Sequence, residues 1–139
     1  MININSIDMY RPKYFSFTEM IHTASTAQEN NLPDWDDINR LLELCRWILD
    51  PVREMYGKPI VVTSGFRTPF LNRLVGGVST SQHMQGLAAD LRCDDPKVLF
   101  DLIAESDLPF DQLIYYQKKK FVHVSYSPTY RHEVIVKDN

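Results

Sequence analysis

Residues 81–90 read SQHMQGLAAD and hold two side chains whose spacing and neighbours point to chemistry. His83 precedes Asp90 by seven residues, and the small residues between them let the chain turn tightly and pack closely. Further along the chain His123 lies in the sequence FVHVS, where strand alternation puts His123 and Ser125 on the same face. We therefore consider His83, Asp90 and His123 together as one candidate site.

Two imidazoles and one carboxylate are ligands that zinc takes in hydrolytic sites. Such a set leaves the fourth tetrahedral position open for water, whose pKa the metal lowers towards neutrality. A histidine and an aspartate seven residues apart also occur together by chance, and His123 alone is equally explained as a half-buried strand residue with satisfied hydrogen bonds. The zinc site predicted here therefore depends on the surrounding sequence as well.

Composition and charge narrow the class of protein. The 139 residues are 44% hydrophobic and 12% aromatic, which is enough for one core. We expect a single domain over residues 1–139, with residues 1–13 as an N-terminal extension. The formal net charge is −3, so no nucleic-acid partner is expected, although residues 118–120 are three lysines. Cys45 and Cys93 are too few for a disulfide scaffold and are expected to be reduced thiols.

No stretch of about 18 apolar residues occurs, and the first ten residues lack a basic segment followed by an apolar run. We therefore expect neither membrane insertion nor a signal peptide, and a protein that is cytoplasmic as synthesised.

The first half of the chain has helical patterns. Ser16 and Glu19 predict a capping box and a short helix to about Ala24, and a loop is expected over residues 26–33. A long helix is predicted from Asp34 to about Gly57, because apolar residues recur at helical spacing between them. Pro51 lies inside this pattern, so a kink or a break is expected before it.

After residue 57 strand patterns predominate. Strands are predicted over residues 60–63, 87–91, 112–116, 121–126 and 133–136, with residues 117–120 as a hairpin loop. Two short helices are predicted between them, over residues 69–74 and from Pro96 to a point before Pro109. Early helices followed by antiparallel strands indicate an α+β fold.

Several segments resemble, in order and spacing, the zinc DD-peptidase family. They are SGFRT at 64–68, Asn72, VGG at 75–77, SQHMQGLAAD at 81–90, FDQLI at 110–114 and VHVS at 122–125. That family includes D-Ala-D-Ala carboxypeptidases and phage L-alanyl-D-glutamate endopeptidases, and it shares its fold with the Hedgehog signalling domain. The resemblance covers residues 14–126. It implies early helices packed on a small, mainly antiparallel sheet that carries a zinc site.

The resemblance also implies roles for individual residues. His83, Asp90 and His123 match the zinc ligands. Arg67, in the SGxR motif, matches a residue beside the metal that binds substrate and can stabilise the scissile carbonyl as it gains charge. Ser81 matches a position that either binds substrate or caps the turn before His83.

One position departs from the family. Many members carry their general base as a carboxylate three residues before the last histidine ligand, whereas here that position is Lys120. No acidic residue occurs over residues 115–122. Asp111 is the nearest upstream carboxylate and is our candidate base, the alternative being that it binds backbone amides in its turn.

Two functions follow from the resemblance. The first is a zinc metallopeptidase that hydrolyses peptidoglycan stem peptides, as a D-Ala-D-Ala carboxypeptidase or an L-Ala-D-Glu endopeptidase, and that reaches the cell wall through phage- or lysis-dependent release. The second is a catalytically weak or inactive zinc-containing module that binds the cell wall. Both imply Zn²⁺ as cofactor and peptidoglycan as partner, and neither predicts an oligomeric state.

Overall fold

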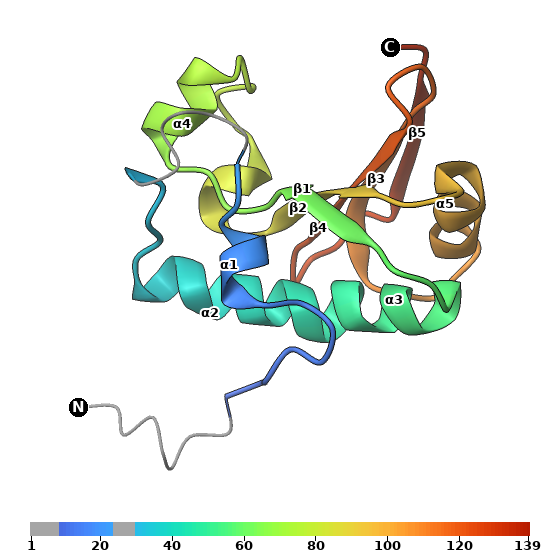
Figure 1. The fold of residues 1–139 in the computed structure, drawn as a ribbon, viewed down its shortest axis with the longest axis horizontal. Helices are drawn as coiled ribbons and strands as arrows, with labels where there is room; N and C mark the ends of the chain where they lie inside the picture. The colour runs from blue at the N-terminus through green and yellow to red at the C-terminus, as the bar shows by residue number, and fades with distance from the viewer. Residues whose placement is uncertain (1–8, 24–29) are drawn as a thin grey trace.

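A long helical segment crosses one face of a five-stranded sheet (Figure 1). The computed structural model describes residues 9–23 and 30–139. The segment comprises α2 (Trp35–Leu44), η2 (Cys45–Leu49) and α3 (Asp50–Tyr56). Asp34 and Asp37 form a capping box at its start, and Gly57 ends it in the left-handed conformation. The predicted helix from Asp34 to Gly57 is therefore confirmed.

Pro51 neither breaks this helix nor begins a new one. The five residues of η2 that precede α3 form a wider π-helical turn, in which the amide of Asp50 donates to the carbonyl of Cys45. In a regular α-helix the ring of Pro51 would collide with the carbonyl four residues earlier. A wider turn before the proline accommodates the ring, so of the two predicted alternatives, a kink or a break, the chain shows no break but a local irregularity of the helix directly before Pro51.

The strands lie in the order β1-β2-β4-β3-β5. Their bounds are β1 Val61–Ser64, β2 Ala88–Arg92, β3 Phe110–Tyr116, β4 Phe121–Tyr126 and β5 Glu133–Lys137. The pairs β1·β2, β2·β4 and β3·β4 are antiparallel, as predicted. However, β5 pairs with β3 in parallel. Since β4 is antiparallel to β3, it ends beside the start of β3, and the short segment after it brings the start of β5 to the same end, where the amide of His132 donates to the carbonyl of Phe110.

The remaining helices are short. They are α1 (Phe17–Met20), α4 (Pro69–Leu74), the 3-10 turn η3 (Gln82–Gln85) and α5 (Pro96–Ala104). The capping box of Ser16 and Glu19 is present, but α1 ends at Met20 and not near Ala24. Residue 24 and part of the predicted loop over 26–33 lie outside the described residues. The helices predicted over 69–74 and from Pro96 are confirmed.

The hydrophobic core lies between the long helical segment and one face of the sheet. Its fully buried members on the helix are Leu44, Ile48, Leu49 and Val52, and those on the strands include Leu91, Leu113, Val122 and Val124. Because side chains alternate along a strand, the residues between these strand positions face the other side of the sheet. That second face carries Asp90 and His123.

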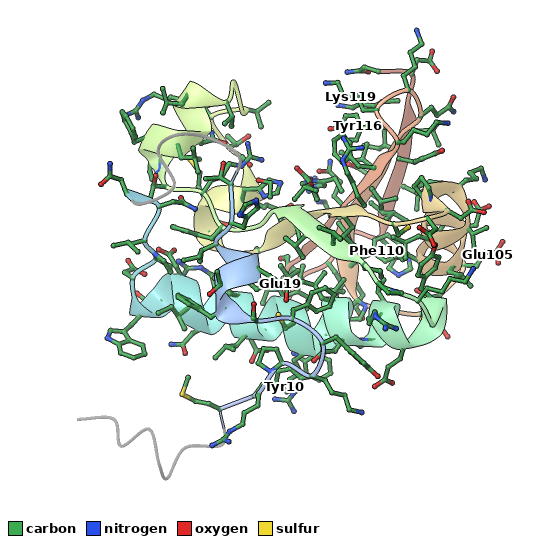
Figure 2. The ribbon with its side chains drawn as sticks, in the orientation of Figure 1. Tyr10, Glu19, Glu105, Phe110, Tyr116 and Lys119 are labelled. Carbon is green, nitrogen blue, oxygen red and sulfur yellow. The ribbon has the colours of Figure 1, made fainter. Side chains whose placement is uncertain are left out.

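The chain before α1 packs on the long helix through Asp50, a carboxylate that is only 3% exposed. Asp50 accepts hydrogen bonds from the hydroxyl of Tyr10 and from the backbone amides of Lys13, at 2.8 Å, and Tyr14, at 3.2 Å. Figure 2 shows Tyr10 on the side of the helix that faces away from the sheet. The division into one domain with an extension over residues 1–13 stays a prediction.

Candidate metal centre

Two neighbouring strands bring Asp90 and His123 together. Asp90 on β2 lies directly opposite His123 on β4 in this antiparallel pair, so the two side chains share a face of the sheet. Nδ1 of His123 lies 2.9 Å from Oδ1 of Asp90. His83 comes from η3, and its Nε2 lies 3.3 Å from the same oxygen. Each of the three residues offers one atom that could bind a metal, and these three atoms lie within 4.8 Å of one another. The structure thus brings together the three residues that the sequence analysis considered as one site.

The orientation of His83 leaves one ring nitrogen without a partner. The residue is 1% exposed, and its Nδ1 lies 2.7 Å from the carbonyl oxygen of Gly65. A carbonyl only accepts hydrogen bonds, so Nδ1 carries the proton and Nε2 keeps its lone pair. Nε2 is buried without a hydrogen-bond partner and faces an oxygen of Asp90. Two buried acceptor atoms that face each other repel unless a proton or a metal ion lies between them, so this arrangement is suited to a metal ion.

Electrostatics favours the protonation states that a metal needs. Burial lowers the pKa of His83, although the negative charge of Asp90 opposes the shift, so the ring is neutral near pH 7. Burial alone would raise the pKa of Asp90, but its interactions with His83 and His123 outweigh this and hold that pKa well below the usual range. A neutral His83 and an ionised Asp90 are the forms in which these side chains bind zinc, and with His123 they form a donor set that fits this metal.

The three residues line a cleft of about 710 Å³. One side of the cleft is formed by Arg67, by Gly77 and by the residues that lead from α4 into η3. The other side is formed by strands β3, β4 and β5 and includes Tyr116 and Arg131. Figure 1 shows α4 and the β3–β4 hairpin on opposite sides of the molecule, and Figure 2 labels Tyr116 near the hairpin end of β3. A peptide in the cleft would thus lie between these two sides and over the ligands.

Arg67 is held beside the candidate ligands by its backbone, whose amide donates to the carbonyl of His83 at 2.9 Å. Its Nε is buried without a partner. Burial lowers the pKa of Arg67, and the charge of Asp90 opposes that shift. Gly77 makes room for the side chain, because a Cβ at Gly77 would lie 3.0 Å from Nη1 of Arg67 and 2.1 Å from Oδ1 of Asn72. Arg67 thus lines the same cleft as His83, Asp90 and His123, which is the place that its predicted substrate-binding role requires.

Ser81 and Lys120, two other positions that the sequence analysis discussed near the site, lie in different surroundings. Ser81 lines the cleft and also caps η3, since its hydroxyl accepts from the amide of His83 at 3.2 Å. Lys120 is exposed, adopts the left-handed conformation at the end of the hairpin loop, and is not among the residues lining the cleft. The structure thus brings Ser81 to the site and leaves Lys120 outside it.

Asp111 is buried behind the cleft wall, and both of its oxygens are engaged. Oδ1 accepts from the backbone amide and from Nε of Arg131, at 2.8 and 3.0 Å. Oδ2 accepts from Nη2 of Arg131 at 2.9 Å and from the side-chain amide of Gln82 at 2.8 Å. These hydrogen bonds lower the pKa of Asp111, with the Arg131 side chain as the main cause. Its role as general base stays a prediction, and its contacts are those of a carboxylate that holds two cleft residues in place.

Sequence reasoning did not single out Gln82, Tyr116 or Arg131, all of which line the cleft. Tyr116 could have been found from strand alternation, because Tyr116 and Phe121 are paired and Phe121 shares the face of His123. Arg131 had no such signal, since it lies in the irregular segment before β5 and reaches the cleft only through the parallel pairing of β5 with β3.

Among the described residues, no helix has the length and apolar character that crossing a membrane requires.

Comparison with known proteins agrees with the geometry. The model of the family named Peptidase M15 matches residues 13–125. A zinc D-Ala-D-Ala carboxypeptidase of Streptomyces albus G is 52% identical over 70 residues, which are 50% of this chain but only 23% of that protein. The match to the family model covers most of the chain and confirms the resemblance seen in the sequence: the chain belongs to the Peptidase M15 family.

Proposed function

We propose that this chain is a zinc-dependent peptidase that hydrolyses peptide bonds in peptidoglycan stem peptides, as a D-Ala-D-Ala carboxypeptidase or an L-Ala-D-Glu endopeptidase, with a Hedgehog-like fold. The observation that carries the proposal is the buried, unpartnered Nε2 of His83 facing Asp90, with His123 on the same carboxylate. Family membership and the zinc carboxypeptidase relative support it.

His83, Asp90 and His123 would hold the zinc. When bound, the metal supplies a Lewis acid that polarises the scissile carbonyl and lowers the pKa of water. The protein contributes the geometry. Gly65 fixes the tautomer of His83, and Arg67, which lines the cleft, would stabilise a substrate carboxylate or the carbonyl oxygen as it gains charge. The substrate is oriented by the two sides of the cleft, so that its reacting bond lies over the ligands.

A second candidate, the weak or inactive module that binds cell wall, is favoured by one observation. Asp90 is the only carboxylate among the described residues that line the cleft, and it is a ligand. Lys120 lies outside the lining and Asp111 is engaged by Arg131 and Gln82. The absence of a general base typically costs about 10²- to 10⁴-fold in rate. Slow turnover with retained binding would result.

The test is to incubate zinc-loaded protein with purified peptidoglycan and to analyse the products by mass spectrometry. Release of D-alanine would identify a carboxypeptidase, and new D-glutamate amino termini would identify an endopeptidase. Zinc-dependent sedimentation with the wall without new termini would identify the binding module. If the protein neither cleaves nor binds the wall, both proposals fail.

The metal assignment has its own test in the variants His83→Ala, Asp90→Ala and His123→Ala. Each is expected to lose stoichiometric zinc, because each removes one of only three protein donors. Zinc per chain is measured by atomic emission after dialysis. His22→Ala is the matched control, since His22 is exposed and does not belong to the cluster. One tightly bound zinc per chain in His123→Ala would show that the ligand set is wrong.

A further inference from the structure

We propose that Arg131 forms a second carboxylate-binding subsite in the cleft, on the β3–β5 side, which selects peptides that carry an acidic residue near the scissile bond. The inference rests on the proposed peptidase function and adds the substrate class to it.

Arg131 is held at its backbone and at its guanidinium. Its amide and its Nε both donate to Oδ1 of Asp111, at 2.8 and 3.0 Å, and Nη2 donates to Oδ2 at 2.9 Å. The amide of the next residue, His132, donates to the carbonyl of Phe110. Asp111 is 4% exposed, whereas the side chain of Arg131 is 57% exposed and lines the cleft. The buried carboxylate of Asp111 thus fixes the orientation of the exposed guanidinium of Arg131.

The bonds to Asp111 leave one edge of the guanidinium available. Arginine has five N–H donors in a planar fork. Asp111 takes Nε and one donor of Nη2, and Nη1 has no hydrogen-bond partner among the described residues. The edge formed by Nη1 and Nη2 can therefore bind a carboxylate through two parallel hydrogen bonds. Because the fork is already fixed, a ligand would lose little binding free energy to ordering it.

Charge in the cleft also favours an anion. The charged side chains among its described lining residues are Arg67, Arg131, Lys137 and the metal ligand Asp90, although the whole chain has a net charge of −3. The ammonium of Lys137 lies 5.6 Å from the ring centre of Tyr116, on the same side as Arg131. A volume of about 710 Å³ is in the usual range for ligand sites. The expected ligand is therefore a short peptide with two groups that bind arginine. One is a carboxylate that binds Arg131, and the other is the group that binds Arg67.

The test compares L-Ala-D-Glu-L-Lys with the same tripeptide carrying D-Gln in place of D-Glu. Both are made with an N-methylated amide after alanine, so that binding to zinc-loaded protein can be measured by calorimetry without cleavage. Wild-type protein is expected to bind the D-Glu peptide more tightly, by about tenfold or more, which is typical of a charge-assisted pair. Arg131→Gln should abolish this preference, because it should weaken the binding of the D-Glu peptide and leave that of the D-Gln peptide unchanged. Arg131→Lys should keep part of the preference.

The matched control is Arg46→Gln, which makes the same change in charge on an exposed part of the long helix outside the cleft. It should keep the wild-type preference. The subsite is excluded if wild-type protein binds the two peptides equally or binds neither. It is also excluded if Arg131→Gln weakens both equally, which would indicate only a structural clamp on Asp111. If the preference behaves as expected but no unmethylated peptide or wall is cleaved, the subsite stands and the peptidase proposal fails.

Discussion

A single carbonyl, that of Gly65, determines which nitrogen of His83 is free for a metal, and this position has no room for a side chain. A Cβ on Gly65 would lie 2.1 Å from the carbonyl oxygen of Met20. Gly65→Ala is therefore expected to displace the Gly65 carbonyl and to weaken zinc binding by about 10- to 100-fold, as changes to groups that orient a ligand do. It should also lower the free energy of unfolding by about 1–3 kcal/mol. Zinc titration and chemical denaturation measure the two effects.

Gly57→Ala is the control for this prediction. Gly57 ends α3 at a φ of 74°, and a Cβ on Gly57 would meet nothing within 4 Å, so its replacement strains the backbone without a clash. It should cost about 1 kcal/mol of stability and leave zinc affinity unchanged. Equal zinc affinity in Gly65→Ala and wild-type protein would contradict the role given to the Gly65 carbonyl.

At the scale of elements, Asp111 joins β3, η3 and the segment before β5, and this connection should depend on pH. The Arg131 side chain holds the pKa of Asp111 below that of an unfolded chain, which is about 3.9. A carboxylate with a lowered native pKa adds stability above the unfolded pKa, and that stability is lost as pH falls through the native pKa. The difference in unfolding free energy between wild-type protein and Asp111→Asn should therefore be largest near pH 7 and shrink below about pH 4.

Denaturation in urea at several pH values, with a chelator present in all samples, measures this difference. Asp101→Asn is the matched control, because Asp101 pairs with Lys97 only on the exposed surface of α5. Its effect should be small, within about 1 kcal/mol at any pH. A difference for Asp111→Asn that stays constant from pH 7 to pH 3 would show that the carboxylate is not held by its partners in solution.

Elements governed by local signals could be predicted from the sequence, and those governed by distant contacts could not. The capping residue Asp34 and the left-handed Gly57 mark the long helix, and the alternation around His123 marks β4, because these signals act within a few residues. The parallel pairing of β5 depends on contacts between residues 131–132 and 110–111, some twenty positions away. The candidate metal ligands are just as far apart in the sequence, but they were singled out because they lie in segments that resemble a family, whereas Arg131 lies outside those segments.

For the whole molecule, the core and the candidate metal centre are on opposite faces of the sheet. None of the three candidate ligands belongs to the hydrophobic cluster between the helices and the strands. Removal of zinc by EDTA should therefore lower the melting temperature by roughly 5 to 15 °C, while the far-ultraviolet circular dichroism at about 20 °C stays unchanged. Loss of the helical signal on chelation would show instead that folding requires the metal, as it does in zinc fingers.

The hydrogen bonds on Asp50 have a practical consequence for where this protein can be shortened. The match to the family model begins at residue 13, which suggests that position as a starting point for expression. Such a chain would lose the hydroxyl of Tyr10 and leave a carboxylate that is 3% exposed with one donor fewer. The loss of a hydrogen bond to a buried charge costs about 1.5–3 kcal/mol. A truncation that preserves stability therefore has to begin before Tyr10, several residues upstream of the boundary that the family match indicates.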